Sequence, residues 1–454
     1  MVIRRALCCM GLLIGSVGTF LATDANATLS AHLQRGEKIV EHPISGRNAE
    51  VCVIPRHFAG AAYAETDLKA EDRLCTTDEN TNAAVCPKTN STNPGIDFYS
   101  LPQGATPKQV ETARCKIAGA KKIAKYKLST SRSYTPSILG YYHVSRILGG
   151  IGNVPPATLR TFDLQNHIAL GRTALAQTVP ASLIHQTWQS LMTQLTAGAQ
   201  ASRRDLLLTD DFSQSYGALS LNPTKEQFYK EFFNGGANNV ARAVNFRDKN
   251  PTLALLARRA DIGSLVGRSF TQDNVQKMVQ LRDASNMIVI DSLMNQQDRF
   301  GNVHYLETRY YRDTNDLAAD GTPTVKSSRK LTPEEAARVG AVKVKELLLK
   351  DNDCGVAKQN IAVQARLADR IAHLDPVTYR ALIRLDATAD SLETKQFFLQ
   401  ELVFTPTDYR SVRQNLGNLA AKFRHACSQG QLKLDLDLQK HFSGKPLQTE
   451  TCSQ

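Results

Sequence analysis

The sequence predicts an α+β fold in which a mixed, sheet-containing N-terminal part precedes a larger, mostly helical part. Helical patterns dominate residues 224–300 and 360–430. Between them lie two strand-like runs, 303–311 and 342–349, which we expect to pair as a hairpin. Further upstream, a short strand is predicted over 123–128. The chain shows no internal repeat, so a repeat architecture is not expected.

Residues 1–27 are predicted to form a cleaved signal peptide. Arg4 and Arg5 precede an apolar stretch over 6–22, and residues 25–27, Ala-Asn-Ala, fit the small-x-small cleavage rule. Glycines interrupt the apolar stretch, which suits a signal peptide better than a membrane anchor. We therefore expect an exported protein, periplasmic or secreted, with no stable membrane insertion.

Seven cysteines remain after the predicted cleavage: Cys52, Cys75, Cys86, Cys115, Cys354, Cys427 and Cys452. In an exported protein, this number predicts up to three disulfides and one remaining thiol. No C-x-x-C pair is present and the ten histidines are scattered, so we do not expect a zinc site. Residues 28–95 hold three of the cysteines and are predicted to be an irregular, disulfide-bearing N-terminal extension.

The strand over 123–128 places Lys125 and Lys127 on one face, because side chains alternate along a strand. These lysines could bind phosphate or could belong to a solvated basic strand. The net charge of +12 is spread along the chain and suits acidic or phosphate-bearing partners in general. Only Tyr126 could stack on a base here, so nucleic acid is not an expected partner. The following helix ends at Gly149-Gly150, which lacks the Gly-Lys-Ser/Thr ending of a phosphate loop.

The chemically informative stretch is 272–356. A helix runs into Asp298-Arg299, one strand begins directly after Asn302, and the paired strand ends at Asp351-Asn352-Asp353. Because a hairpin places the start of one strand beside the end of the other, we expect Asp298, Asn302 and Asp351 to lie close together. One carboxylate could then orient an attacking hydroxyl, while another, with an amide, could hold a metal that bridges phosphates. Alone, an Asp-Arg pair is usually a cap or surface ion pair, and an acidic turn is common.

Several motifs in this chain carry a family resemblance. Residues 295–299, Asn-Gln-Gln-Asp-Arg, resemble the Gly-Asn-x-Asp-Arg stretch of the secretory-pathway kinases that include the Golgi casein kinase. Residues 349–355 resemble that family's Leu-Asp-Asn-Gly-x-Gly segment, the counterpart of the metal-binding Asp-Phe-Gly of ordinary kinases. Residues 146–148 and 154–156 are similar to its Arg-Ile-Leu and Val-Pro-Pro. The resemblance spans 115–430, and spore-coat kinases share the Asp-Arg and paired-Asp pattern.

The resemblance implies a two-lobed protein-kinase-like fold that binds ATP and Mg²⁺ or Mn²⁺ between its lobes. The small lobe would cover 96–222 and the larger lobe 223–445. Asp298 would be the catalytic base, and Asp351 the metal ligand, with Asp353 as its rival.

Three further positions take their roles from the same resemblance. Asn302 would be a second metal ligand, although it follows Asp298 by four residues where kinases usually have five. Lys127 or Lys125 would bind the nucleotide phosphates.

One departure from the family concerns the glutamate that usually pairs with this lysine from the following helix. Between Lys127 and Asp163 the chain has no acidic residue, and Ser137 or Ile138 occupies the expected neighbourhood. Another carboxylate could hold the lysine, the nucleotide could bind differently, or the protein could be a pseudokinase.

We therefore predict an exported atypical kinase that transfers the γ-phosphate of ATP to a hydroxyl. Protein Ser/Thr is favoured as the acceptor over a sugar of a glycan. Because ATP is scarce outside the bacterial cytoplasm, such an enzyme would act after delivery into a host cell or another ATP-bearing space. The alternatives are a nucleotide-binding pseudokinase that regulates or scaffolds a partner, and a secreted binding protein without a nucleotide site.

Overall fold

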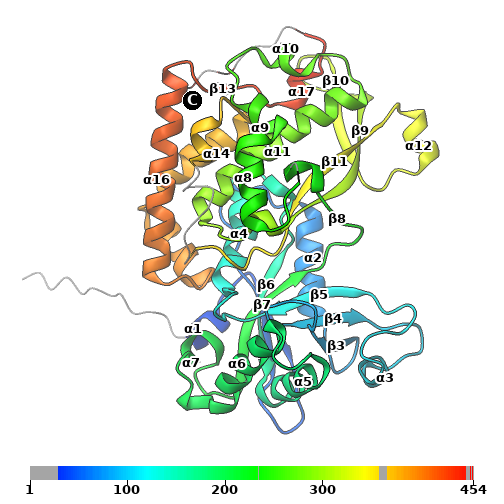
Figure 1. Cartoon of the computed structure of the whole chain (residues 1–454), viewed down its shortest axis with the longest axis vertical. Coiled ribbons are helices and arrows are strands. Elements are labelled where there is room, and N and C mark those ends of the chain that lie inside the picture. Colours follow the sequence, from blue (N-terminus) through cyan, green and yellow to red (C-terminus); the bar gives the residue numbers. More distant parts are fainter. Residues whose placement is uncertain (1–28, 234, 357–365, 446–449, 451, 453–454) are drawn as a thin grey trace, which may run out of the picture.

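Two antiparallel sheets organise the chain. The structure, a computed structural model, describes residues 29–233, 235–356, 366–445, 450 and 452, so the predicted signal peptide lies outside the described residues. A seven-stranded sheet has the order β1-β2-β6-β7-β5-β4-β3, and a four-stranded sheet has the order β10-β9-β11, with β8 also paired to β9. Figure 1 shows the larger sheet in the lower lobe and the smaller sheet among the helices of the upper lobe.

The seven-stranded sheet has helices on both faces. Its strands are β1 (Lys38–His42), β2 (Glu50–Ile54), β3 (Ala83–Pro87), β4 (Ile96–Ser100), β5 (Lys122–Lys127), β6 (Ala157–Asp163) and β7 (Gln214–Leu221). The accompanying helices are α1 (Leu29–Leu33), α2 (Glu65–Thr76), α3 (Pro107–Thr112), α4 (Thr135–Ile147), α5 (Leu164–Gln177), α6 (Leu183–Ala197) and α7 (Arg204–Leu207).

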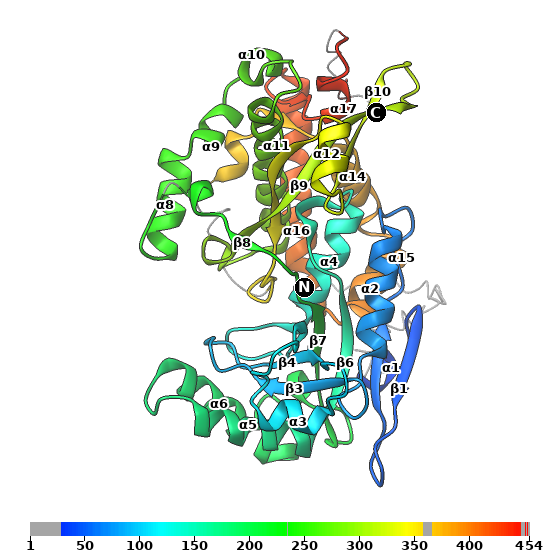
Figure 2. The same cartoon turned by 90° about the vertical axis from the view of Figure 1, so that its right-hand side faces the viewer.

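Alternation along β5 decides which of its side chains face the helical lobe. Ala124 and Tyr126 are buried with Trp188 of α6 in the core beneath α5 and α6. Lys125 and Lys127 therefore point to the opposite face, the face that α4 covers. Figure 2 shows α5 and α6 at the far end of the lower lobe and α4 at its junction with the upper lobe.

The predicted irregularity of residues 28–95 is wrong. This segment supplies β1, β2, β3 and α2, and its strands belong to the same sheet as β5. The Thr- and Asn-rich composition masked the strands, because each is only five residues long and gains its stability from its neighbours in the sheet.

The upper lobe is built around one buried helix. Almost every residue in the second half of α11 (Gln272–Met294) is buried, which is typical of a helix surrounded by other elements. The remaining helices are α8 (Asn239–Lys249), α9 (Pro251–Leu256), α10 (Ile262–Val266), α12 (Pro333–Arg338), α14 (Pro376–Thr388), α15 (Leu392–Gln396), α16 (Pro406–Ser428) and α17 (Leu438–His441). The strands are β8 (Gln227–Phe228), β9 (Val303–Leu317), β10 (Pro323–Ser328), β11 (Val342–Leu349), β12 (His373–Leu374) and β13 (Lys433–Leu434).

The predicted α+β class and the predicted hairpin are confirmed. Residues 303–310 of β9 pair with the whole of β11, and Val303 at the start of β9 lies opposite Leu349 at the end of β11. β9 is longer than the predicted strand, because its second half pairs with β10, a strand that the polar sequence of the excursion did not indicate.

Three disulfides form, as the cysteine count predicts: Cys52–Cys75, Cys86–Cys115 and Cys427–Cys452. Cys354 keeps its thiol, whose sulfur donates to the carbonyl oxygen of Arg132 at 3.1 Å. None of the described helices is both long enough and apolar enough to span a membrane.

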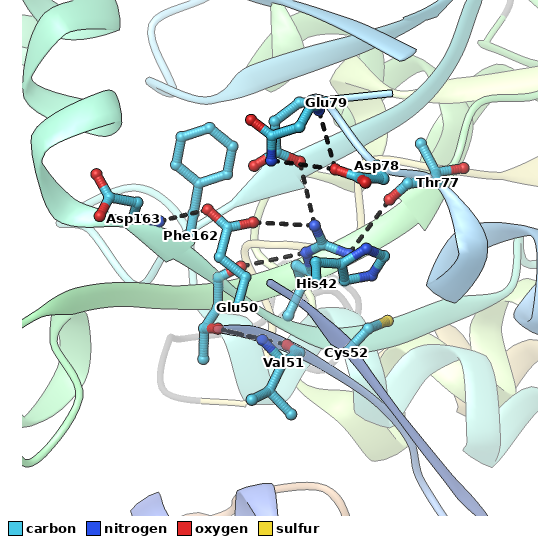
Figure 3. A network of polar contacts seen from close by, with 12 residues as sticks. His42, Glu50, Val51, Cys52, Thr77, Asp78, Glu79, Phe162 and Asp163 are labelled. Carbon is cyan, nitrogen blue, oxygen red and sulfur yellow. Dashed lines mark hydrogen bonds and ion pairs between the residues drawn. The ribbon is translucent and has the colours of Figure 1, made fainter. Parts of the chain in front are cut away.

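A buried ion cluster links the neighbouring strands β2 and β6 of the seven-stranded sheet. Arg160 of β6 donates to Glu50 of β2 at 3.0 Å and to Glu79 at 3.1 Å, and the side chains of Arg160 and Glu50 have no exposed surface. Glu50 also accepts the backbone N–H of Asp163 at 2.6 Å (Figure 3). Burial, and then the neighbouring Glu79 carboxylate, raise the pKa of Glu50.

Candidate active site

The structure brings the two predicted motifs together. Beyond the β9–β11 pairing, the N–H of Gln297 donates to the carbonyl oxygen of Cys354 at 3.0 Å, and the N–H of Val356 donates to that of Met294 at 2.6 Å. The loop that carries Asp298 therefore runs beside the turn that carries Asp351 and Asp353. Two short chain segments more than fifty residues apart thus form one polar surface.

Arg299 joins the two motifs from within the core. It is buried, and its guanidinium donates to both carboxylate oxygens of Asp291 at 2.9 and 3.0 Å. The same group donates to the Asn352 side-chain oxygen at 2.7 Å. Arg299 is therefore neither a helix cap nor a surface ion pair, because it connects α11 to the acidic turn.

Asp298 is half-buried and held by amides on both carboxylate oxygens. The side-chain N–H groups of Asn239 and Asn302 donate to its Oδ1 and Oδ2, the latter at 3.2 Å. Burial, and then the charge of Asp353, raise the pKa of Asp298, while the two amides oppose that shift. Asn302 contacts Asp298, as its position before β9 predicts.

Asn239 is a site residue that sequence reasoning missed. It begins α8, 59 residues before Asp298, and no motif marks it. Gly301 makes room for it, because a Cβ at that position would lie 2.8 Å from the Asn239 side-chain nitrogen.

Lys127 takes its carboxylate partners from the acidic turn instead of from a helix. Its ammonium donates to Asp353 at 2.7 Å and to Asp351 at 3.2 Å, and Lys125 lies 3.4 Å from Asp351. Burial alone would lower the pKa of Lys127, but the two carboxylates outweigh it and raise that pKa. Although burial opposes its charge, the ammonium groups of Lys127 and Lys125 hold the pKa of Asp351 well below its usual range.

The helix that lacks the expected glutamate binds the acidic turn through Ser137. The Ser137 hydroxyl donates to the backbone oxygen of Asn352 at 2.6 Å and accepts the N–H of Gly355 at 3.0 Å. Gly355 is needed here, since a Cβ would lie 2.6 Å from that hydroxyl and 2.9 Å from the Met294 carbonyl oxygen. α4 thus positions the turn through an uncharged hydroxyl group.

One residue of the loop between β3 and β4 contacts this cluster and a second is buried near it, and both escaped sequence reasoning. Asn93 donates to Asp353 at 2.9 Å. Lys88 is buried, and burial, together with the nearby Lys127, lowers its pKa to about 7. Their segment has the composition of a polar linker. Recognising β3 and β4 on either side of it would have predicted a hairpin loop there.

A cavity opens beside the cluster. A small cavity of about 30 Å³ is lined by Lys125, Lys127, Asp351 and Asp353. It shares the wall residues Val154, Pro155, Leu221 and Pro223 with a cavity of about 890 Å³ that lies along the segment connecting β7 to β8. The larger volume is in the range of small-molecule sites.

The donor set fits a hard divalent cation that also binds phosphate. Within the described ranges, no three His, Cys, Asp or Glu side chains gather as a self-sufficient metal site. Mg²⁺, however, usually takes one or two carboxylates, with phosphate oxygens and water completing its shell. Asp351 and Asp353 can supply the carboxylates, and the adjacent lysines suit the phosphates.

The order of these parts along the chain defines a kinase-like fold. A hairpin of β3 and β4 precedes the lysine strand β5 and the helix α4, and a loop with Asp-Arg then precedes an acidic turn. Kinases arrange a phosphate-covering loop, a lysine strand, a helix, a catalytic loop and a metal-binding turn in this order.

The comparison with known proteins gives matches among solved structures alone. No protein-family model matches the chain, and no curated protein matches it. The solved structures that it resembles include the Golgi casein kinase with Mn/ADP bound, at 10% identity over 79% of this chain and 76% of that chain, with a TM-score of 0.39. They also include hydra Fam20 with sugar, at 11% identity over 83% of this chain and 95% of that chain, with a TM-score of 0.41.

Proposed function

We propose that the protein is an ATP- and divalent-metal-dependent kinase that transfers the γ-phosphate of ATP to a hydroxyl, with protein Ser/Thr favoured over sugar. One observation carries the proposal. The Asp351–Asp353 turn and the lysine strand β5 meet at one cavity, and the Asp298 loop is hydrogen-bonded to the segment that follows the turn.

The proposed roles follow from the chemistry of each group. Lys127, with Lys125 beside it, binds the nucleotide phosphates, because an ammonium that already bridges two carboxylates can share its donors with phosphate oxygens. Asp351 and Asp353 hold Mg²⁺ or Mn²⁺, which when bound would neutralise charge on the phosphates.

Asp298 accepts the proton of the attacking hydroxyl. The amides of Asn239 and Asn302 orient its carboxylate. Asn302 can also serve as the second metal ligand through its side-chain oxygen.

The missing helix glutamate does not leave Lys127 without a carboxylate. Asp353 lies 2.7 Å from its ammonium nitrogen, which favours the reading in which another carboxylate holds the lysine. The same contact is compatible with a pseudokinase that binds nucleotide without transferring phosphate, so the test must separate binding from transfer.

The test combines a binding assay with a transfer assay on the mature protein. We expect ATP with Mn²⁺ to raise the melting temperature, and we expect ³²P to move from ATP to casein or to the protein itself. Asp298→Ala should reduce transfer about 10²- to 10⁴-fold without loss of binding, because the base acts on the acceptor hydroxyl. The exposed Asp205→Ala is the matched control and should transfer normally.

Each alternative gives a different result in the same assays. Binding without transfer in the wild type would support the pseudokinase. Absence of any nucleotide-dependent shift would support a secreted binding protein. Full transfer by Asp298→Ala would show that the base has been assigned wrongly.

We also propose that the protein is exported and acts where ATP is available, such as inside a host cell. Three disulfides support an oxidising compartment during folding. Fractionation of a free-living culture tests whether the protein reaches a space that contains ATP. A mature protein found only in the periplasm, with no phosphorylated target there, would contradict delivery to an ATP-bearing space.

A further inference from the structure

A further cavity lies between the lobes, away from the Lys127 cluster. Its volume is about 1080 Å³, close to the upper end of the range for small-molecule sites. The lower lobe contributes α1, α7 and the turn before β7, and the upper lobe contributes α15 and the segment that leads into α16. Figure 1 shows α1 and α7 beneath the lower end of α16. None of its lining residues also lines the two cavities at the Lys127 cluster.

The wall that α1 forms is fastened to both lobes. In the lower lobe, the backbone N–H of Ser30 donates to the carboxylate of Asp210 at 3.0 Å. In the upper lobe, the His32 ring is hydrogen-bonded to the carbonyl oxygen of Gln400 at 2.5 Å. The cavity is therefore a preformed space with a fixed wall, and a molecule bound in it would contact both lobes at once.

Arg35, just after α1, brings a charge without a partner to this cavity. It is one of the lining residues, and its Nη1 is buried with no hydrogen-bond partner among the described residues. No carboxylate in that part of the chain pairs with its guanidinium. The next residue, Gly36, has a φ of 123° and packs so closely on β2 that a Cβ would collide there, which fixes the turn that carries Arg35. A half-buried cation with no counter-charge is best explained by an anion that binds beside it.

The other walls are largely apolar, and most of their charges are already paired. Apolar and aromatic side chains come from both lobes: Leu208, Phe212, Tyr216, Leu399, Val403 and Phe404. Arg204 pairs with Asp205 at 3.5 Å, and Asp210 accepts from Ser30. Three Lys or Arg side chains and two Asp side chains line the cavity, the third cation being Lys395, so their charges sum to a single positive charge.

An amphipathic molecule with one negative charge matches these walls. Transfer of a hydrocarbon chain from water to apolar walls is favourable, and a carboxylate can accept two hydrogen bonds from one guanidinium. A phosphate monoester carries a charge of about −1.5 to −2 at neutral pH, which exceeds the single positive charge of the lining. A carboxylate head group is therefore the better match.

We propose that this cavity between the lobes binds a long-chain monocarboxylate, a fatty acid, and that Arg35 binds its carboxylate. The apolar side chains of the two lobes hold the hydrocarbon chain. The site lies outside both kinase-like motifs, and its occupancy does not depend on the proposed phosphate transfer.

Three probes and a set of variants test the assignment. Calorimetric titration of the mature protein measures its affinities for decanoate, decyl phosphate and decanol, and decanoate should bind most tightly. Arg35→Met should weaken decanoate binding about 10- to 100-fold, the usual effect of one charge-assisted hydrogen bond, and leave decanol binding unchanged. Leu399→Trp should weaken both, because the larger ring fills the space for the chain. Arg172→Met, at an exposed position of α5 outside the lining, is the control and should bind like the wild type.

A measurement on the wild type guards against variants that fail to fold. A fatty acid that carries a photoactivatable diazirine in its chain is cross-linked to the protein, and mass spectrometry identifies the labelled peptides. Label should appear within residues 203–216 or 392–406, and excess decanoate should remove it. Label confined to other segments would overturn the inference.

Three further results would also overturn it. If Arg35→Met binds decanoate as tightly as the wild type, Arg35 does not bind the carboxylate. If the wild type binds no decanoate, the cavity is not a fatty-acid site. Tighter binding of decyl phosphate than of decanoate would contradict the carboxylate assignment. Binding of ADP with Mn²⁺ is measured on the same samples, so a failure of the proposed nucleotide site is distinguished from a failure of this one.

Discussion

Two buried charge clusters, one within the lower lobe and one between the lobes, resemble each other in composition and differ in setting. In one, Arg160 lies between Glu50 and Glu79; in the other, Lys127 lies between Asp351 and Asp353. Each has one cation held by two carboxylates at 2.7–3.2 Å. The geometry of the ion pairs alone would not say which cluster performs chemistry.

The surroundings of the two clusters make the distinction. Arg160 and Glu50 have no exposed side-chain surface, and Arg160 also donates to the carbonyl oxygens of Thr77 and Thr161. That cluster is closed, and it links β2, β6 and the segment after α2. The Lys127 cluster borders a cavity, and Asp351 is partly exposed. An ion cluster beside open space can exchange a protein partner for a ligand, whereas a sealed cluster can only stabilise the fold.

The largest expected effect comes from breaking the closed cluster. Arg160→Met would leave two carboxylates facing each other in the core, which should lower the free energy of unfolding by about 3–5 kcal/mol. Chemical denaturation measures the loss, and ADP affinity of the folded fraction should stay the same. Arg204→Met, at an exposed ion pair, is the control, with an expected change within about 0.5 kcal/mol. A fully stable Arg160→Met would contradict the structural role of this cluster.

Breaking the Lys127 cluster should weaken ligand binding much more than it lowers stability. Asp351→Asn removes a proposed metal ligand and should weaken Mn²⁺-dependent ADP binding about 100-fold, at the upper end of what altered metal sites lose. Stability should fall by only about 1–2 kcal/mol, because Asp353 still pairs with Lys127 and Asp351 is partly exposed. Calorimetric titration and denaturation of the same sample give both numbers. The comparison between the clusters breaks down if Asp351→Asn loses stability and keeps its affinity.

A smaller effect should follow from changing a residue that orients the Asp298 carboxylate. Asn239→Ala removes one of the two amides on Asp298 and should lower kcat about tenfold, with nucleotide affinity unchanged. Initial rates of ³²P transfer measure this. Gly301→Ala should act in the same direction, because its methyl group would displace Asn239. The exposed neighbour Val240→Ala should transfer at the wild-type rate; an equal loss there would indicate a general disturbance of α8.

The closed cluster should also make the stability of the protein depend on pH. Because the pKa of Glu50 is raised in the folded protein, folding takes up a proton, and the stability linked to it falls as pH rises from the ordinary glutamate range toward the folded pKa. Glu50→Gln does not titrate, so its stability relative to the wild type should increase with pH, by at most about 1.4 kcal/mol per pH unit. Melting curves from pH 5 to pH 8 test this, with Glu65→Gln as the exposed control. If the stability difference between Glu50→Gln and the wild type does not change with pH, the raised pKa of the buried Glu50 is contradicted.

Local patterns were enough to predict one half of the site. The pairing of β9 with β11, and with it the meeting of Asp298 and the acidic turn, follows from strand periodicity within a stretch of about fifty residues. The alternation along β5 likewise placed Lys125 and Lys127 on one face. Such features depend on the residues of one or two neighbouring elements, which is why they can be read from the sequence.

The other half of the site was decided only when the lobes packed together. The sequence by itself determined the α+β class, the hairpin and the candidate Asp, Asn and Lys side chains. The tertiary structure decided that Lys127 pairs with Asp353, 226 residues away, in place of a helix glutamate. It also brought Asn239 to Asp298 and Asn93 to Asp353, and it sealed Arg160 between Glu50 and Glu79. Contacts between distant segments arise from the packing of sheets and helices, and no local periodicity encodes which charged side chains that packing will bring within reach.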